Sequence, residues 1–241
     1  MPAPRTGMTM IAEPAVEPLA GPSLYRLLAW LSPSFPIGAF SYSHGLEAVV
    51  GDGAVHDRAS LEGWIATVVT RGSGRIDADI LRQAYLAAAT ADLRALDAAN
   101  RRGLAFRSTE ELALEAAQQG KAFLDTCRAA WPESFIGDWS VDEVCHSAVF
   151  GAVAARAGIV LADAVVGYLE AFAGNLVSAG LRLGIIGQTD GQRILAALEP
   201  AIVSATSAAL TRGIADFGAA TFAADLASIA HENQYSRLFR S

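Results

Sequence analysis

Residues 161–184 read LADAVVGYLEAFAGNLVSAGLRLG, and this stretch decides the fold class. Bulky and small side chains alternate along it, and apolar residues would lie on most faces of a helix. Small side chains let helices approach closely, and a helix that is apolar on most faces is covered by other elements. We therefore expect these residues to form a helix at the centre of a helical domain.

Helical periodicity continues outward from this stretch. The spacing i, i+3, i+4, i+7 of a buried stripe recurs at Leu61, Trp64, Ile65, Val68 and Val69. It recurs in two more segments, at Val141, Val144, Cys145, Ala148, Val149 and Ala152, and at Phe222, Leu226 and Ile229. No segment combines strand-like alternation with flanking turn residues. The sequence predicts an all-α fold, a single-domain, compact bundle of about nine or ten helices.

Predicted helix ends come from capping residues. Three Ser or Thr residues have the spacing of a capping box: Ser108 before Glu111, Ser140 before Glu143, and Thr189 before Gln192. Three glycines are placed to end helices in the left-handed conformation: Gly72, Gly158 and Gly187. Pro200 predicts a bend or a new helix within residues 194–210.

Three parts of the chain are distinguished by composition. Five prolines fall within residues 1–22, which predicts a flexible N-terminal arm. Residues 23–230 contain no second break in composition and form the predicted helical domain. Residues 231–241 follow as a C-terminal tail.

Charge and hydropathy restrict the function classes. The formal net charge is −7 and Lys121 is the only lysine, which disfavours nucleic acid as a partner. The longest uncharged stretch, residues 27–46, contains two prolines and two glycines, so we expect no membrane span there. Glu13 and Glu17 occupy the place where a secretory leader needs an apolar run. We expect a cytoplasmic protein.

Recognisable catalytic motifs are absent from the sequence. A phosphate-binding loop needs a glycine five residues before Gly-Lys, and Glu115 stands where that glycine would precede Gly120–Lys121. Neither a G-x-S-x-G elbow nor a C-x-x-C pair occurs. We expect no catalytic residues, no metal site and no cofactor, and hence a protein that is not an enzyme.

One alternative stays open at this point. Asp142 and His146 are four residues apart and would share a face if both lay on one helix. They are the best candidates for a helical small-molecule or metal-binding protein or enzyme. The competing interpretation places Cys145 as a small buried side chain and His146 as a hydrogen-bonded polar group between helices.

Three stretches do not read as ordinary helix or loop. Residues 34–47 are aromatic and apolar yet rich in proline and glycine, which fits either a buried connection or a rigid recognition loop. Residues 182–193 predict a tight interhelical corner that displays polar side chains. The tail combines aromatic and arginine residues, the composition of interface hot spots. We expect that the tail cannot bury these side chains within its own subunit and becomes ordered on a partner.

Together the three stretches resemble the urease accessory protein UreF family. The resemblance rests on Phe35-Pro36-x-Gly38-x-Phe40 running into Ser43-x-Gly45-Leu46-Glu47, on Gly187-Gln188-Thr189-Asp190-Gly191-Gln192, and on the terminal Ser236-Arg237-Leu238-Phe239-Arg240-Ser241. It covers residues 23–241.

The resemblance implies a homodimeric maturation factor, a chaperone component for nickel insertion without catalytic activity of its own. It implies that the protein bridges a UreD/UreH-type accessory protein and the GTPase UreG on apo-urease and modulates GTP-dependent nickel delivery. The residues that it assigns to the UreD-type partner are Tyr235, Ser236, Arg237, Leu238, Phe239, Arg240 and Ser241. Those that it assigns to a GTPase-facing or dimer surface are Phe35, Pro36, Gly38, Phe40, Ser43, Gly45, Leu46, Glu47, Arg182, Gln188, Asp190 and Gln192.

Two mechanisms are compatible with this resemblance. In one, the protein is a scaffold that presents the GTPase. In the other, it changes the rate of GTP hydrolysis, for which an arginine finger from Arg182 or Arg193 is the obvious device.

Overall fold

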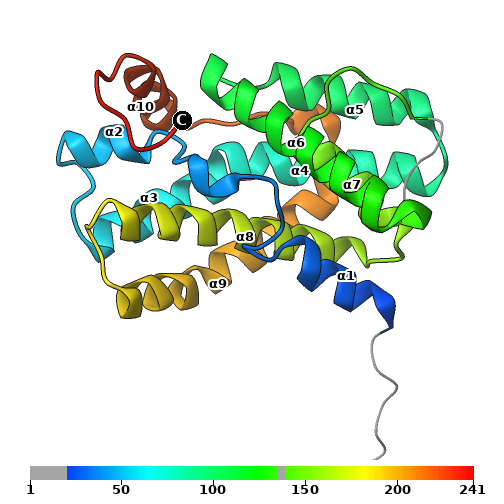
Figure 1. Ribbon diagram of the computed structural model, residues 1–241, viewed down its shortest axis with the longest axis horizontal. Helices are drawn as coiled ribbons and strands as arrows, with labels where there is room; N and C mark the ends of the chain where they lie inside the picture. Colours follow the sequence, from blue (N-terminus) through cyan, green and yellow to red (C-terminus); the bar gives the residue numbers. More distant parts are fainter. Residues whose placement is uncertain (1–20, 135–138) are drawn as a thin grey trace, which may run out of the picture.

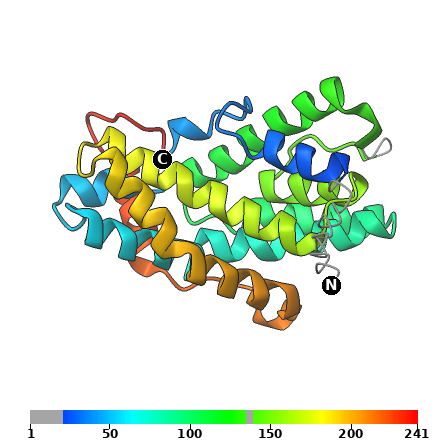
Figure 2. The same ribbon diagram turned by 90° about the horizontal axis from the view of Figure 1, so that it is seen from below.

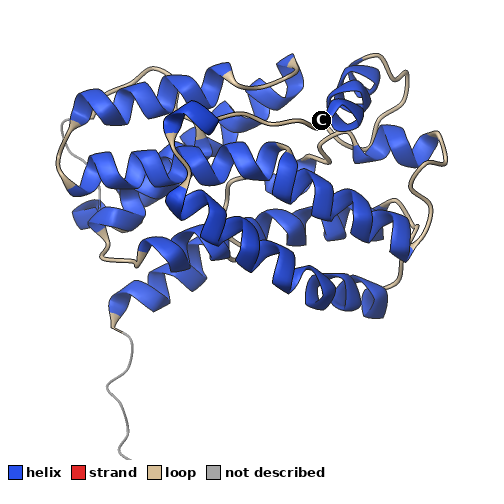
Figure 3. Cartoon of the chain, turned by 180° about the vertical axis from the view of Figure 1, so that it is seen from behind, coloured by secondary structure: helices blue, strands red, loops and turns tan. Residues whose placement is uncertain are grey.

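The computed structural model describes residues 21–134 and 139–241, and its regular elements are all helical (Figures 1 and 3). The all-α prediction is confirmed. The α-helices within the described ranges are α1 (Pro22–Trp30), α2 (Leu46–Gly51), α3 (Arg58–Arg71), α4 (Ser73–Ala89), α5 (Leu93–Ala105), α6 (Glu110–Ala130), α7 (His146–Arg156), α8 (Leu161–Arg182), α9 (Gln188–Thr211) and α10 (Phe222–Glu232). Single 3-10 turns form at η1 (Ala39–Ser41), η2 (Pro132–Ser134) and η3 (Ile214–Asp216).

Helices α4, α7 and α8 make up the middle of the bundle. Residues 146–154 of α7 are all buried, and α4 packs along this helix (Figure 2). The two backbones come so close that a methyl group on Gly151 would collide with the carbonyl of Leu81. Helix α8 contacts α3, α4, α7 and α9, so the stretch 161–184 is a core helix as expected. The most completely buried helix is α7.

Hydropathy singles out two helices by length and composition. Helices α8 and α9 are long and apolar enough to cross a membrane, although 50% of the α8 window and 28% of the α9 window are buried inside the fold. A core helix of a soluble protein meets the same test. The absence of a membrane partner stays a prediction.

Several predicted helix ends are shifted. The N-cap of α6 is Thr109, not Ser108, and its side chain accepts a hydrogen bond from the Leu112 amide at 3.2 Å. Gly187 is the N-cap of α9 rather than the end of α8, where Gly184 takes the left-handed conformation (φ +76°). Gly158 does follow α7 with φ +70°, as predicted. Helix α9 continues through Pro200.

The predicted helix start at Ser140 is wrong, because a side chain from α5 binds the backbone of residues 143–145, which is not helical. Buried Asn100 donates to the Glu143 carbonyl at 2.9 Å and accepts from the Cys145 amide at 2.7 Å. These two bonds replace the helical ones, so α7 begins only at His146. Val144 and Cys145 are buried nonetheless.

Most of the predicted N-terminal arm, residues 1–20, lies outside the described residues. Within the described part, Pro22 already begins α1, at a position where its missing N–H costs nothing. At the other end, α10 extends to Glu232, two residues into the segment expected to be tail. From here on, "the tail" denotes residues 233–241.

Candidate interaction surface of α10 and the tail

The tail turns back from α10 and lies against η1, α2 and α6 (Figure 1). Glu47 of α2 accepts hydrogen bonds from the backbone amides of Leu238 (2.7 Å) and Phe239 (2.9 Å). The Arg240 amide donates to the Ser41 carbonyl at 2.8 Å, and the Ser43 amide donates to the Ser241 carbonyl at 2.9 Å. The structure therefore joins the first and third sequence motifs into one site.

Two tail side chains are buried in the subunit that carries them. Phe239 is 3% exposed and Ser241 is fully buried. The Ser241 hydroxyl donates to Glu115 Oε2 at 2.9 Å. The expectation that the tail finds no place within its own subunit is thus wrong for these residues. The reason is that η1, α2 and α6 supply hydrogen-bond acceptors for the tail, which tail composition cannot reveal.

The rest of the tail faces outward. Tyr235 and Leu238 are exposed, at 107% and 59% of their reference areas. On α10, the row of Phe222, Leu226 and Ile229 is also exposed, at 81%, 64% and 46%. The helical spacing of this row was predicted correctly, but its burial was not. These five side chains are exposed in the single chain, and we refer to them together as the α10–tail surface.

Two glycines in the left-handed conformation shape the first motif, against which the tail packs. Gly38 and Gly45 have φ values of +73° and +74° and precede η1 and α2. A side chain on Gly45 would also meet the Ser228 amide of α10 at 2.8 Å, so α2 and α10 touch through this glycine. Phe35, Ser43 and Leu46 are buried, whereas Phe40 is 66% exposed. Phe40 is therefore the large side chain of this motif that is available to a partner.

Buried polar groups lie beneath the tail. Glu115 of α6 is 5% exposed, and its Oε1 lies 2.9 Å from His44 Nε2 and accepts from Gln119 Nε2 at 2.8 Å. Tyr42 donates to Gln118 at 2.7 Å, and burial, followed by the charge of Glu115, raises the Tyr42 pKa. These contacts connect the tail to the interior through α6.

The second motif forms a separate surface. Gln188 and Gln192 are exposed at the start of α9, and Asp190 pairs with Arg193 at 3.0 Å and with Arg58 of α3 at 4.0 Å. The predicted capping box at Thr189 is absent, since no side chain caps α9. This corner is a candidate binding surface distinct from the tail.

Neither arginine proposed as a finger is unpaired. Arg182 stacks on the Phe239 ring and donates to the Phe40 carbonyl, while Arg193 pairs with Asp190. Arg182 thus holds the tail against the end of α8.

The structure does not bring Asp142 and His146 together on one helical face. Asp142 is exposed and precedes α7, whereas His146 is buried as the first residue of that helix. Burial lowers the His146 pKa from 6.5 to about 4, so the ring is neutral at pH 7. Its Nδ1 lies 3.3 Å from the Tyr168 hydroxyl, which fits the interpretation of a polar group between helices.

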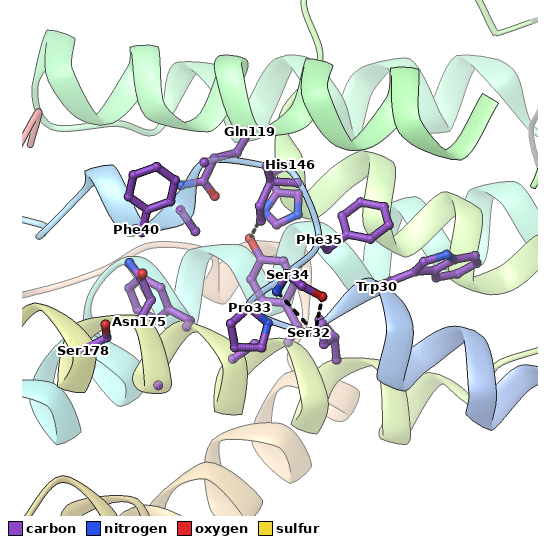
Figure 4. A pocket seen from close by; sticks show the side chains of 18 of the residues that line it. Trp30, Ser32, Pro33, Ser34, Phe35, Phe40, Gln119, His146, Asn175 and Ser178 are labelled. Atoms are coloured by element: carbon purple, nitrogen blue, oxygen red, sulfur yellow. Dashed lines mark hydrogen bonds between the residues drawn. The ribbon is translucent and has the colours of Figure 1, made fainter. Parts of the chain in front are cut away.

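His146 also lines a cavity that sequence reasoning missed. This cavity of about 520 Å³ lies under residues 32–40, and Figure 4 shows Phe35, Gln119, His146 and Asn175 around it. Glu115 lines it too, so the cavity and the tail share one carboxylate. Across residues 21–134 and 139–241, no three His, Cys, Asp or Glu side chains are grouped to hold a metal ion.

The fold and the exposed residues define the class of protein. It is an all-helical protein with exposed apolar side chains on α10 and the tail. A UreF family model matches residues 55–199. Urease accessory protein UreF of Granulibacter bethesdensis is 48% identical over 222 residues, which cover 91% of this chain and 94% of that protein. UreF of Bradyrhizobium sp. strain ORS 278 is 46% identical over 91% of this chain and 92% of its own length. The chain belongs to the UreF family of urease accessory proteins, and this membership implies a role in urease maturation.

Proposed function

We propose that this protein is a cytoplasmic, homodimeric scaffold of urease maturation. It binds a UreD/UreH-type accessory protein through the α10–tail surface and presents the GTPase UreG through a second surface. In this way it bridges the two on apo-urease and modulates GTP-dependent nickel delivery. The chain has no catalytic role of its own in this account.

One observation carries the proposal, the exposure of Phe222, Leu226 and Ile229 on α10 together with that of Tyr235 and Leu238 in the tail. Exposure of large apolar side chains to water is unfavourable, and aromatic residues are enriched at interface hot spots. Because Phe239 and Ser241 anchor the tail, the outward residues are presented in a fixed geometry, which reduces the entropy lost on binding. The UreD-type partner is proposed here because the family resemblance implies that such a partner packs on the C-terminal segment.

The GTPase-facing assignment is supported differently. Phe40 is exposed in the first motif, against which the tail packs. The corner at Gln188, Asp190 and Gln192 offers polar and charged groups. Since Arg182 and Arg193 are both engaged in contacts within the chain, the scaffold mechanism requires fewer rearrangements than an arginine finger.

Co-purification with the UreD-type partner tests the proposal. We expect the wild-type chain to co-elute with it and a Phe222→Asp/Leu226→Asp variant not to, while the helical circular dichroism of both stays the same. Co-elution of the folded double variant at wild-type yield would contradict it. Complex mass with UreD and UreG, with and without nucleotide, then tests the bridge.

A further inference from the structure

His231 of α10 is a fully buried histidine whose two ring nitrogens both face carboxylates. Its Nδ1 lies 2.7 Å from Glu111 Oε2 on α6, and its Nε2 lies 3.2 Å from Glu47 Oε2 on α2. One imidazole therefore bridges α10 to two other helices.

The same two carboxylates hold the tail. Glu47 accepts the Leu238 and Phe239 amides, and Glu111 pairs with the Arg237 guanidinium. From α10 itself, Glu232 accepts a hydrogen bond from the Glu111 amide at 3.2 Å. Glu47, Glu111, His231 and Arg237, which we call the His231 clamp, thus connect α10, α2, α6 and the tail.

The number of protons on the His231 ring decides how strongly the clamp binds α10 and the tail to α2 and α6. A neutral imidazole has one N–H, so it can donate to only one of the two carboxylates and presents a lone pair to the other. The imidazolium donates to both, and its charge together with Arg237 balances Glu47 and Glu111. Loss of the proton leaves a partly buried carboxylate opposite a ring lone pair, which is costly away from water.

We propose that the His231 clamp is a proton-controlled latch that holds α10 and the tail on their own subunit. The protonated ring is the form that closes the latch. Its contribution is therefore present while both ring nitrogens carry a proton and is lost when one of those protons is removed. This property belongs to the isolated chain and does not depend on the proposed partner.

Amide hydrogen exchange of the full chain tests the latch directly, because the Leu238 and Phe239 amides donate to Glu47. We expect their protection factors, corrected for intrinsic exchange, to fall about tenfold or more between about pH 5.5 and about pH 8.5. The fall should accompany the loss of one of the two ring protons of His231, which NMR of the imidazole detects. Amides in the middle of α7 should keep their protection throughout.

Two variants make the test specific. In His231→Gln the tail amides should be weakly protected and independent of pH, whereas in His56→Gln, a change of an exposed loop histidine, they should behave as in the wild type. Wild-type tail protection that stays constant over this pH range would overturn the proposal. A fall of equal size in folded His231→Gln would overturn it as well, and if that variant fails to fold, the wild-type titration decides alone.

Discussion

The guanidinium of Arg182 lies 4.1 Å from the ring centroid of Phe239, although 57 residues separate the two in sequence. Arg182 is the last residue of α8 and also donates to the Phe40 carbonyl. This contact fixes the end of a core helix, the first sequence motif and the tail relative to one another. Stacking of this kind contributes about 0.5–2 kcal/mol, depending on how far the cation is desolvated.

Replacing Phe239 by Ala is expected to release the tail without unfolding the bundle. The buried ring and its contact with Arg182 are lost, but the tail is a terminal segment that can detach locally. We expect the free energy of unfolding to fall by only about 1–2 kcal/mol, less than for a typical core Phe. Denaturant unfolding measures this value, and hydrogen exchange should show a loss of protection at residues 238–241.

Leu238→Ala is the matched control for that prediction. Its side chain is mostly exposed, so the free energy of unfolding should change by less than about 0.5 kcal/mol. Equal destabilisation by Leu238→Ala and Phe239→Ala would mean that the tail is not anchored by the aromatic ring.

His146 is expected to make the protein sensitive to acid. Burial keeps its folded-state pKa at about 4, against 6.5 for an exposed ring, so the unfolded chain binds the proton first. Stability should therefore fall as the pH drops from about 6.5 towards 4, by up to about 3 kcal/mol. Chemical denaturation across this range should show a shallower slope for His146→Asn than for the wild type, and parallel slopes would contradict the assignment.

The contact between α4 and α7 depends on Gly151. We expect Gly151→Ala to destabilise the fold by about 1–3 kcal/mol, because the new methyl group would force the helix away from the Leu81 carbonyl. Gly174→Ala on α8 has open space around its new methyl group and should stabilise by about 0.5–1 kcal/mol. Thermal unfolding of the two variants should shift in opposite directions, and a loss of stability in both would show that α8 is packed more tightly than described.

The Phe40→Ala variant tests whether the first motif contributes to urease activation independently of its contribution to stability. The side chain is 66% exposed, so unfolding should change little, while activation of urease by the complete set of accessory proteins should drop several-fold. Leu86→Ala, at an exposed site on α4, should leave both unchanged. Full urease activation by the folded Phe40→Ala variant would contradict the assignment of Phe40 to a partner surface.

The periodicity of apolar residues correctly predicted the helices in which that spacing alone determines the buried face. Leu61, Ile65, Val68 and Val69 are buried along α3 as expected, and α8 is a core helix. The start of α7 could not be predicted, because Asn100, more than 40 residues earlier, competes for the backbone of residues 143–145. Burial of α10 was also predicted wrongly, since spacing shows that a face is apolar and not what covers it.

The candidate site was only partly predictable for a related reason. Composition identified Tyr235 and Leu238 as exposed apolar residues at the chain end. It did not show that Phe239 and Ser241 bind to residues 40–47 of the same chain, because Ser43 and Ser241 are 198 residues apart and no local pattern connects them. The role of Glu47 as the acceptor for the tail backbone follows from the three-dimensional arrangement alone.

The most direct test is a calorimetric titration of the full chain with the UreD-type accessory protein. The account predicts that Leu226→Asp weakens the dissociation constant at least about tenfold, while Leu86→Asp, at a comparably exposed site on α4, binds like the wild type. Wild-type affinity in a folded Leu226→Asp variant would contradict the assignment of the α10–tail surface as the docking site.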